Sequence, residues 1–457
     1  MTLTRAADVS YLASLVCLPL VGADLIVLAT GRDAGAGLQP AYLLLAVAVA
    51  LRLGTLARTE GRAAARGALG GPAGRFLGWA GGLAAAALAM SALGIVVARA
   101  SVEAGEAWWR YARQVAQVLV MVCFVAYPAL WTRGEARWRA TFCALVGGLV
   151  VQDVYALGQA WHFLRPNPFF AALERIFTSN PAILAGSEEL YLEGHFRGVP
   201  RLRGTACEPL YLGNYLLLVL PLLAGQAGRR RGARLVVAVG AVLLLFTWSR
   251  GAALASLVGL AAWLGLRRRA QLALPWRRVV VGTAAALAAT AVLTALVAGS
   301  DAWLFPLRRL AQSLDRGDWS NLTRLYSMQA AWRAFLLSPV VGVGWGQFAF
   351  HFPLLVDPLG LQSQFTWPVV NNVPLLVLCE TGVLGLAALA LVTGRLLRDT
   401  WRRLAVAEPS CAARLAVIAA ATIAVAAQLL TFSQYNLPHI WVAPGLWLAA
   451  LWEGESR

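Results

Sequence analysis

The sequence predicts an all-α protein with many membrane-spanning helices. Of its 457 residues, 59% are hydrophobic and only 13% are charged, whereas an ordinary soluble domain is about 25% charged. Disordered, collagen-like and small disulfide-rich proteins also have different compositions. The net charge of +17 comes from arginine, since the chain contains no lysine. These arginines lie in short clusters between apolar runs, which favours a membrane protein over a nucleic-acid-binding one.

Apolar runs long enough to cross a bilayer, which takes about 20 residues, recur along the chain. The run at 234–266 is too long for one helix and short for two. We divide it at Ser249-Arg250-Gly251, where glycine permits a tight turn and Ser249 can cap the next helix. This gives twelve predicted spans: 11–29, 41–57, 76–98, 111–131, 140–161, 208–227, 234–248, 251–266, 279–298, 373–394, 413–432 and 438–452.

The arginine clusters predict the orientation of the chain. With twelve spans every cluster falls on one side, and basic residues mark the cytoplasmic side of a membrane protein. Both termini are therefore expected in the cytoplasm, and the segments 162–207 and 299–372 on the outer side. The clusters follow the second, fourth, sixth, eighth and tenth spans: Arg58, Arg62, Arg66 and Arg75; Arg133, Arg137 and Arg139; Arg229, Arg230, Arg231 and Arg234; Arg267, Arg268, Arg269, Arg277 and Arg278; and Arg395, Arg398, Arg402 and Arg403.

The second outer segment carries apolar residues at helical spacing, which predicts amphipathic helices lying against the membrane surface. The chain then divides into N-terminal spans with the first outer segment (1–207), a core that includes the second outer segment (208–394), and C-terminal spans (395–457). No cleavable signal is expected, because no small-residue cleavage site follows the first apolar run. The spaced apolar residues are Leu322, Leu325, Tyr326, Met328, Trp332, Phe335 and Leu336.

Four of the six cysteines lie within the predicted spans, and the cysteines form no Cys-x-x-Cys pair. Neither a zinc site nor a disulfide framework is indicated, and only Cys207 lies at the outer edge. We find no cluster of metal ligands in the sequence and expect no metal or other cofactor.

Arg250 interrupts two apolar halves within Phe246-Thr247-Trp248-Ser249-Arg250-Gly251-Ala252, at the predicted outer end of a helical hairpin. A charge at the edge of the hydrocarbon region is costly and therefore informative. A planar, permanently charged guanidinium suits diphosphate oxygens in an outward-facing cavity. The alternative is an arginine that only extends from the hairpin tip to the membrane surface.

A second candidate stretch is Arg201-Leu202-Arg203-Gly204-Thr205-Ala206-Cys207-Glu208-Pro209, which leads into the sixth span. Basic side chains such as Arg203, with Glu208 as an acidic partner, could bind phosphate and position an acceptor hydroxyl at a membrane mouth. The alternative is a salt-bridged helix start with Pro209 in its first turn.

The third stretch lies in the second outer segment, where Asn321-Leu322-Thr323-Arg324 precedes Ser338-Pro339-Val340-Val341-Gly342-Val343-Gly344-Trp345-Gly346. Small residues allow close backbone approach and a sharp turn. The glycines do not follow a strand, so a dinucleotide-binding interpretation fails. Arg324, one helix upstream, is the candidate for chemistry.

The fourth stretch opens the tenth span with Asn371 and Asn372 and continues to Glu380-Thr381-Gly382-Val383-Leu384-Gly385. Glu380 lies roughly two helical turns deeper, where a carboxylate needs a partner. Asparagines at a helix start are commonly caps, which is the structural alternative.

Taken together and in order, the four stretches resemble the O-antigen ligase and polymerase superfamily of bacterial envelope glycosyltransferases. The matching elements are Arg-Gly-x-x-x-Glu-Pro at 203–209, Ser-Arg-Gly at 249–251, Arg324 before Ser-Pro-x-x-Gly-x-Gly at 338–344, and Glu-x-Gly-x-x-Gly at 380–385. The resemblance covers roughly residues 200–390, and the flanking spans match only in hydropathy.

The resemblance implies a GT-C-like fold in the bacterial inner membrane, with the active site facing the periplasm. It implies transfer of a glycan from an undecaprenyl-diphosphate-linked donor to a saccharide or lipid A core acceptor. Arg250 and Arg324, with Arg203 as a further candidate, are expected to hold the diphosphate, because fixed guanidinium groups stabilise the charge of the leaving group. Asn372 and Glu380 complete the expected substrate-binding residues.

One departure concerns the catalytic base. The family usually opens its tenth-span motif with His-Asn, where this chain has Asn371-Asn372. Histidine can accept a proton or orient the diphosphate, whereas asparagine can only orient. Either the residue only orients substrate, or His351, Asp357 or Glu208 takes over as base, or this chain has lost or changed its reaction. We therefore name Asn371, Glu208 and His351 as candidate catalytic residues.

The sequence does not determine the acceptor or the type of reaction. Ligation to lipid A core and polymerisation of repeat units, in lipopolysaccharide or exopolysaccharide biosynthesis, use the same donor. The Glu208-Pro209 pair and the missing histidine favour a polymerase. A transporter or flippase of lipid-linked oligosaccharide would suit twelve spans and an arginine-lined cavity, but such proteins usually have pseudo-symmetric halves. An inactive family member is the remaining alternative.

Overall fold

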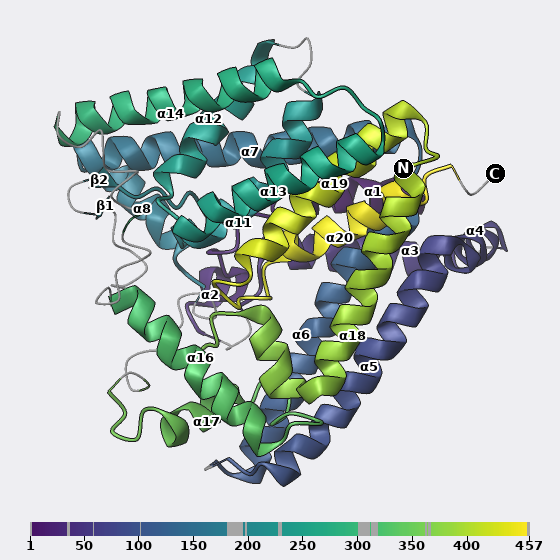
Figure 1. Cartoon of the computed structure of the whole chain (residues 1–457), viewed down its shortest axis with the longest axis vertical. Coiled ribbons are helices and arrows are strands. Elements are labelled where there is room, and N and C mark those ends of the chain that lie inside the picture. Colours follow the sequence, from purple (N-terminus) through teal and green to yellow (C-terminus); the bar gives the residue numbers. More distant parts are fainter. Residues whose placement is uncertain are drawn as a thin grey trace.

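The computed structural model describes residues 2–33, 37–57, 59–100, 102–180, 195–196, 199–226, 231–299, 311, 319–361, 363 and 367–454. Within these ranges the chain is helical, apart from one antiparallel pair of two-residue strands, β1 (His195–Phe196) and β2 (Val199–Pro200). The all-α prediction is confirmed for this part of the chain (Figure 1). Parts of both predicted outer segments and the cluster residues Arg58, Arg229 and Arg230 lie outside the described ranges. The helices are α1 (Leu3–Val16), α2 (Leu25–Thr30), α3 (Pro40–Thr55), α4 (Thr59–Gly70), α5 (Pro72–Val97), α6 (Ala104–Trp131), α7 (Glu135–Leu164), α8 (Pro168–Phe177), α11 (Pro209–Gln226), α12 (Arg231–Phe246), α13 (Arg250–Arg269), α14 (Trp276–Ala298), α16 (Trp319–Leu337), α17 (Phe348–Leu355), α18 (Val373–Leu404), α19 (Pro409–Gln428) and α20 (Pro438–Leu451).

Each predicted span coincides with one helix, except the first. Within the described residues, six helices are long and apolar enough to cross a membrane, namely α5, α6, α7, α14, α18 and α19, and the bent pair of α3 and α4 would make a seventh. α11 and α20 are apolar but shorter. The chain is therefore a multi-pass membrane protein, while twelve crossings and the GT-C-like arrangement stay predictions.

The first predicted span, 11–29, is not one helix. α1 and α2 are separated by residues 17–24, and Pro19 lies in this break. A proline has no N–H to continue the helical ladder. The carbonyl of Pro19 instead accepts a hydrogen bond from the Thr205 hydroxyl at 3.0 Å. The prediction of a continuous helix is wrong, because the residue that stabilises the break, Thr205, lies far away in the sequence.

The long apolar run at 234–266 forms two helices, as predicted. α12 ends at Phe246 and α13 begins at Arg250. The Ser249 side chain accepts a hydrogen bond from the Ala252 N–H at 3.2 Å, so Ser249 caps α13 as predicted. Arg250 is therefore the first residue of α13, at the tip of the α12–α13 hairpin.

Two hydrophobic clusters hold the helices together. The larger one joins most of the membrane helices, among them α1, α3, α6, α7, α11, α13, α19 and α20. The smaller one packs α16, α17 and α18 against α6, through residues such as Ala334, Phe348 and Phe352. The second outer segment is therefore attached to the ends of α6 and α18 by a core of its own (Figure 1).

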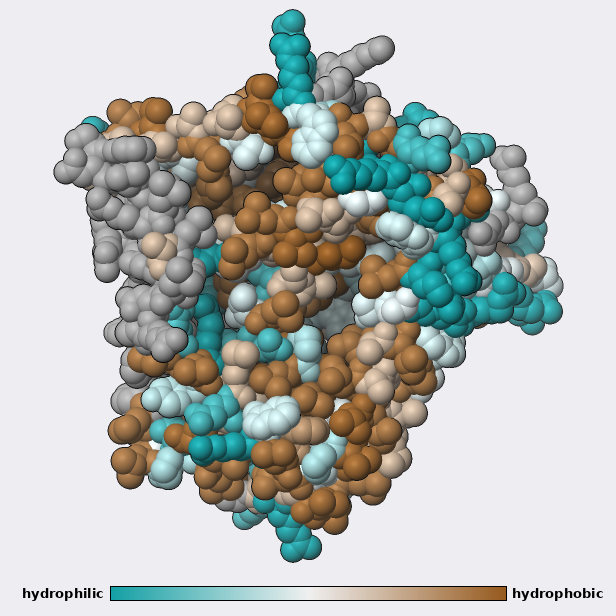
Figure 2. Space-filling view, viewed as in Figure 1, coloured by the Kyte–Doolittle hydropathy of each residue, from teal (hydrophilic) through white to brown (hydrophobic). Residues whose placement is uncertain are grey.

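The helix ends that carry arginine clusters meet one another. Arg269 donates a hydrogen bond to a backbone carbonyl near the end of α18 at 3.2 Å, and Arg403 donates to the Glu453 carbonyl at 2.8 Å. Arg414, at the start of α19, pairs with Glu453 and with Glu135 at the start of α7. These ends and both termini lie on the right of Figure 1, and hydrophilic surface gathers on the same side in Figure 2.

The outward faces of several membrane helices are apolar. Val97 of α5 and Val280 and Leu296 of α14 are exposed, and apolar surface covers much of the view in Figure 2. An apolar surface of this extent marks an interaction site or an aggregation hazard in water. A surrounding bilayer accounts for it.

Candidate functional site

Three polar side chains of α16 contact different parts of the chain. Asn321, Arg324 and Ser327 are spaced by three residues, which places them on one side of the helix. Each lies close to a stretch singled out from the sequence. α16 therefore gathers residues from the hairpin tip, from the segment before α11 and from the start of α18.

Arg250 is buried at the hairpin tip. Its side chain is held by Asn321, whose Oδ1 accepts a hydrogen bond from Nη2 at 3.1 Å, and the residue is only 8% exposed. As the first residue of α13, it lies beside backbone N–H groups that carry the positive end of the helix dipole. A guanidinium and a helix N-terminus together favour an anion. Burial argues against an arginine that merely reaches for the membrane surface.

Glu208 lies immediately before α11, among basic side chains. Burial raises the pKa of its carboxyl above the usual 4.5, while Arg201, a hydrogen bond with Tyr211, and Arg324 oppose the increase. Arg201 is held in place because its Nε donates to the Thr247 carbonyl at 3.2 Å. One carboxyl group and two guanidinium groups from separate segments therefore share this site.

Asn371 has φ +57°, a left-handed conformation in which asparagine is enriched. Its Nδ2 donates to the Ser327 Oγ at 3.3 Å, and the Ser327 hydroxyl donates to the Val370 carbonyl at 2.9 Å. The start of α18 is thus fastened to α16 about one turn from Arg324. We call the following residues the α16 cluster: Arg201, Glu208, Arg250, Asn321, Arg324, Ser327 and Asn371.

Arg203 has other partners. Its guanidinium pairs with Glu174 of α8, which also accepts hydrogen bonds from the Tyr155 hydroxyl at 2.9 Å and from Gln159 Nε2 at 3.1 Å. The backbone N–H of Arg203 donates to Gln159 Oε1 at 3.0 Å. Arg203 therefore anchors the segment before α11 to α7 and α8. Burial raises the pKa of the nearby Cys207 thiol to about 12, so this thiol stays protonated at neutral pH.

Asn372 and Glu380 also have structural partners. The Asn372 side chain caps α18, accepting a hydrogen bond from the Leu375 N–H at 2.9 Å. The Glu380 carboxylate accepts hydrogen bonds from the N–H groups of Gly346 at 2.8 Å and Phe348 at 2.9 Å. The carboxylate expected inside the membrane thus finds its partners in the backbone of the second outer segment.

Glycines in the motifs at 338–344 and 380–385 explain this contact between the second outer segment and α18. α18 is kinked at Gly382, whose φ is +65°, and near the kink the Val343 N–H donates to the Cys379 carbonyl at 2.9 Å. A Cβ on Gly342 would lie 2.3 Å from the backbone carbon of Glu380. Only glycine fits there, so the Ser-Pro-x-x-Gly-x-Gly and Glu-x-Gly-x-x-Gly motifs form one junction between the outer segment and α18.

His351 and Asp357 have no hydrogen bond to Asn371 among the described residues. His351 is buried in α17, and burial lowers the pKa of its imidazole to about 4. The Asp357 carboxylate accepts hydrogen bonds from the N–H groups of Leu361 and Ser363, each at 2.8 Å, and so stabilises a loop. Of the three candidate bases, only Glu208 belongs to the α16 cluster.

The sequence did not select Arg201, Asn321 or Ser327 as site residues. The spacing of Asn321, Arg324 and Ser327 on one helical face was a usable signal for two of them. Arg201 lies two residues before Arg203 in the same motif, and nothing local distinguishes the two. In the part of the chain that the structure describes, no group of three or more histidine, cysteine, aspartate or glutamate residues could hold a metal ion.

A buried chain of hydrogen bonds behind the hairpin tip was also missed. Gln428 Nε2 donates to the Ser249 Oγ at 3.4 Å, and Asn214 Nδ2 donates to Gln428 Oε1 at 3.1 Å. Asn214 Oδ1 lies 2.9 Å from His439 Nε2. The residues come from α11, α19 and α20, so no local pattern in the sequence joins them.

The middle of the chain is similar to a known protein family. Residues 235–390 match the family described as O-antigen ligase. This stretch of the chain is similar to the O-antigen ligase family. The match confirms the resemblance seen in the sequence, and it includes Arg250, Arg324 and Asn371. No curated protein matches the chain.

The matched residues run from α12 into α18, and the match supports a membrane glycosyltransferase activity of the ligase or polymerase type. Arg201 and Glu208 precede the matched residues. They nevertheless interact with the matched residues, Arg201 through the Thr247 carbonyl and Glu208 through Arg324.

Proposed function

We propose that this protein transfers a glycan from an undecaprenyl-diphosphate-linked donor to a saccharide acceptor, on the periplasmic face of the bacterial inner membrane. The α16 cluster carries the proposal, because it gathers Arg250, Arg324 and one carboxyl group, Glu208, at helix ends opposite to the arginine clusters. The acceptor is a growing polysaccharide or the lipid A core.

The donor diphosphate binds Arg250, Arg324 and the N-terminus of α13. During transfer the bond between the anomeric carbon and the diphosphate oxygen breaks, and that oxygen leaves with the electron pair. Fixed guanidinium groups and helix N–H groups stabilise the growing negative charge without reorganisation. Burial of Arg250 strengthens this effect, since water screens it less.

The acceptor hydroxyl attacks the anomeric carbon and passes its proton to the Glu208 carboxylate. Glu208 is the candidate base because it lies near Arg324, one of the two arginines that hold the leaving group. Asn371 cannot accept a proton, so it orients a substrate oxygen by donating from its amide. The hydrogen bond to Ser327 fixes the direction of this amide.

The lipid part of the donor suits the surroundings of α16. Leu325, Trp332 and Leu336 are exposed on this helix, and apolar side chains of this kind suit contact with lipid. A diphosphate bound to Arg324 on the protein-facing side then leaves its prenyl chain next to lipid.

The proposal is tested by supplying purified lipid-linked oligosaccharide and acceptor to the outer face of proteoliposomes. Arg250→Ala and Arg324→Ala are each expected to lower the transfer rate by roughly 100-fold or more, since each removes stabilisation of the leaving group. Product formation at that face requires transfer and no membrane crossing, so a transporter gives none.

Arg175→Ala is the matched control. Arg175 is an exposed arginine on α8, at the same end of the molecule as the segment before α11, and its removal is expected to leave the rate unchanged. Full activity of both the Arg250 and Arg324 variants, with normal membrane insertion, would show that these arginines do not hold the diphosphate.

A further inference from the structure

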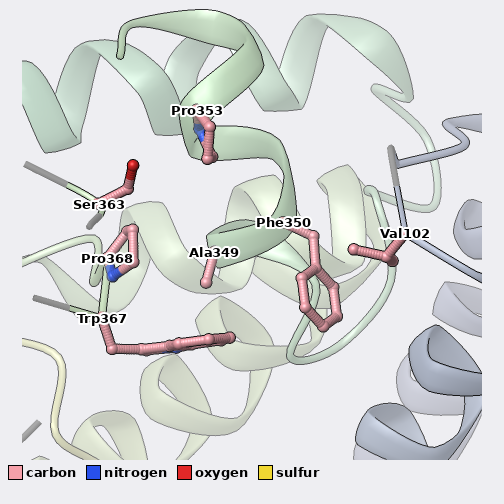
Figure 3. Close-up of a pocket in the computed structure, with 7 residues that line it drawn as sticks. All are labelled: Val102, Ala349, Phe350, Pro353, Ser363, Trp367 and Pro368. Atoms are coloured by element: carbon pink, nitrogen blue, oxygen red, sulfur yellow. The ribbon is translucent and has the colours of Figure 1, made fainter. Parts of the chain in front are cut away.

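Two cavities adjoin each other beside the α16 cluster. The first has a volume of about 320 Å³, and Phe350, Pro353, Ser363 and Trp367 are among its lining residues (Figure 3). The second, of about 140 Å³, shares Trp367 with the first, along with Ala349 and Pro368. Its wall includes Val370, the residue whose carbonyl is bound by Ser327 of the cluster. A molecule filling both cavities would therefore end next to Asn371.

The first cavity has an aromatic wall. Trp367 is 43% exposed, and its ring lies 5.9 Å from that of Phe350 at an angle of 82°. Figure 3 shows the Trp367 ring edge-on along one side of the cavity, with Pro353 and Ser363 across from it. The Arg110 guanidinium lies over the Trp367 ring at 4.4 Å, and Arg110 is fixed by a hydrogen bond to the Gly346 carbonyl. The indole is thus a supported, accessible flat surface.

The second cavity has a polar wall. Four residues with side-chain amides line it, together with Ser433 and Tyr435 and the charged residues Arg110 and Glu380. Among the described residues, the side-chain amides of Gln434 and Asn436 make no hydrogen bond, so both are available to a ligand. Each amide offers donors and an acceptor, which suits neighbouring hydroxyl groups. The amides are those of Gln114, Gln117, Gln434 and Asn436.

We infer that the two cavities form a saccharide-binding subsite, which seats sugar rings of the glycan on Trp367 and binds their hydroxyls through the amides of Gln434 and Asn436. A sugar ring has a face of C–H groups and an edge of hydroxyls. The C–H face packs on an aromatic surface, and the hydroxyls bind to polar groups such as amides. The two cavities place an aromatic wall and a polar wall side by side. Ligand pockets of this kind combine aromatic lining with a few placed polar groups, in volumes of about 300 Å³ and above.

The polar wall decides against a lipid chain as the occupant. An acyl or prenyl chain would bury the amides of Gln434 and Asn436 without partners, at a cost of about 1–3 kcal/mol for each unpaired group. A saccharide satisfies them. The inference rests on the proposed function in taking the ligand from the glycan of that reaction, and it assigns where the sugar, rather than the diphosphate, is recognised.

The experiment measures binding of a sugar that lacks the diphosphate. The probe is the oligosaccharide released by mild acid from the polyprenyl-diphosphate fraction of the source cells, titrated by calorimetry into the full-length protein in nanodiscs. Trp367→Ala is expected to weaken binding about tenfold, the size of one lost aromatic contact, while Trp367→Phe retains most of the affinity. Gln434→Ala is expected to weaken binding by a smaller factor.

Trp276→Ala is the control, because Trp276 of α14 is 46% exposed, close to the 43% of Trp367, and this variant should bind like the wild type. The inference is overturned if wild-type protein does not bind the oligosaccharide, or if Trp367→Ala binds it unchanged. Density for an acyl chain in the cavities, in a reconstruction with the oligosaccharide present, would overturn it too. Loss of transfer in Arg250→Ala with intact oligosaccharide binding supports both proposals, whereas normal transfer in that variant affects only the diphosphate assignment.

Discussion

Glu208 is the residue whose protonation matters most for the proposed chemistry. Burial disfavours its ionised form and raises the pKa, while Arg201 and Arg324 favour the ionised form and lower it. Burial is the larger influence. The carboxyl group therefore keeps its proton at pH values where an exposed glutamate is already ionised, which brings a potential base closer to the working pH.

The transfer rate should accordingly rise with pH and level off, with a midpoint above the ordinary value of 4.5 for this carboxyl. Glu208→Gln should remove this rise and lower the plateau by about 100-fold or more. Arg201→Ala removes a charge that lowers the pKa, so its midpoint should move to higher pH. Initial rates in proteoliposomes across the pH range measure both effects. A wild-type rate independent of pH from about 4.5 upward, or a fully active Gln variant, would exclude Glu208 as the base.

Some site arginines can be predicted from the sequence and others cannot. Arg250 and Arg324 stand out in a sequence because a charge beside apolar residues needs a reason, and the structure brings both into one cluster. Arg201 and Arg203 look equivalent in the sequence. Glu174 decides between them, since it binds the Arg203 guanidinium from a helix 29 positions upstream, and no local pattern carries that information.

Whole helices were easier to predict than their interruptions. Apolar length predicted α5, α6 and α7, and Ser249 with Gly251 predicted the division between α12 and α13. The break at 17–24 and the kink at Gly382 were not predicted, because each is stabilised by a segment far away in the sequence. Glycine marked the second of these positions without indicating that a loop packs into it.

The start of α13 is positioned by the buried hydrogen bonds of Gln428. This side chain donates to Ser249, the cap of α13, and to the Leu210 carbonyl at 3.2 Å, while it accepts from Asn214. Gln428→Leu keeps a similar volume but leaves these buried groups unpaired, at about 1–3 kcal/mol. We expect a lower unfolding temperature. Because Arg250 loses its fixed position, we also expect the Michaelis constant for the donor to rise, by a factor several times larger than the factor by which kcat falls.

Thr422→Val is the matched change on the same helix. The Thr422 hydroxyl is buried but donates only to the Ile418 carbonyl one turn away, so its loss should leave the donor Michaelis constant within about twofold of the wild type. If Gln428→Leu lowers the unfolding temperature without changing that constant, the hydrogen bonds of Gln428 stabilise the fold and do not position Arg250.

At the scale of the molecule, the two ends of the bundle have different compositions. Arg269, Arg403 and Arg414 each contact a neighbouring helix end or the segment after α20. The α16 cluster lies at the other ends of these helices. The sequence predicted this polarity from the arginine clusters alone. It did not predict the two adjoining cavities, because their walls combine α6, α17, the segment before Asn371 and the segment 433–436.

The different composition of the two ends predicts which end faces the cytoplasm, and this prediction does not depend on the reaction. If the arginine-rich ends face the cytoplasm, a cysteine placed at Arg175 should react with a membrane-impermeant maleimide in intact spheroplasts, and one placed at Arg268 should react only after permeabilisation. Both positions are exposed, and Cys143 is the exposed native cysteine, so Cys143→Ser provides the background. Labelling of the Arg268 position alone before permeabilisation would invert the topology and place the α16 cluster in the cytoplasm. There a lipid-linked donor already moved to the outer leaflet could not reach it.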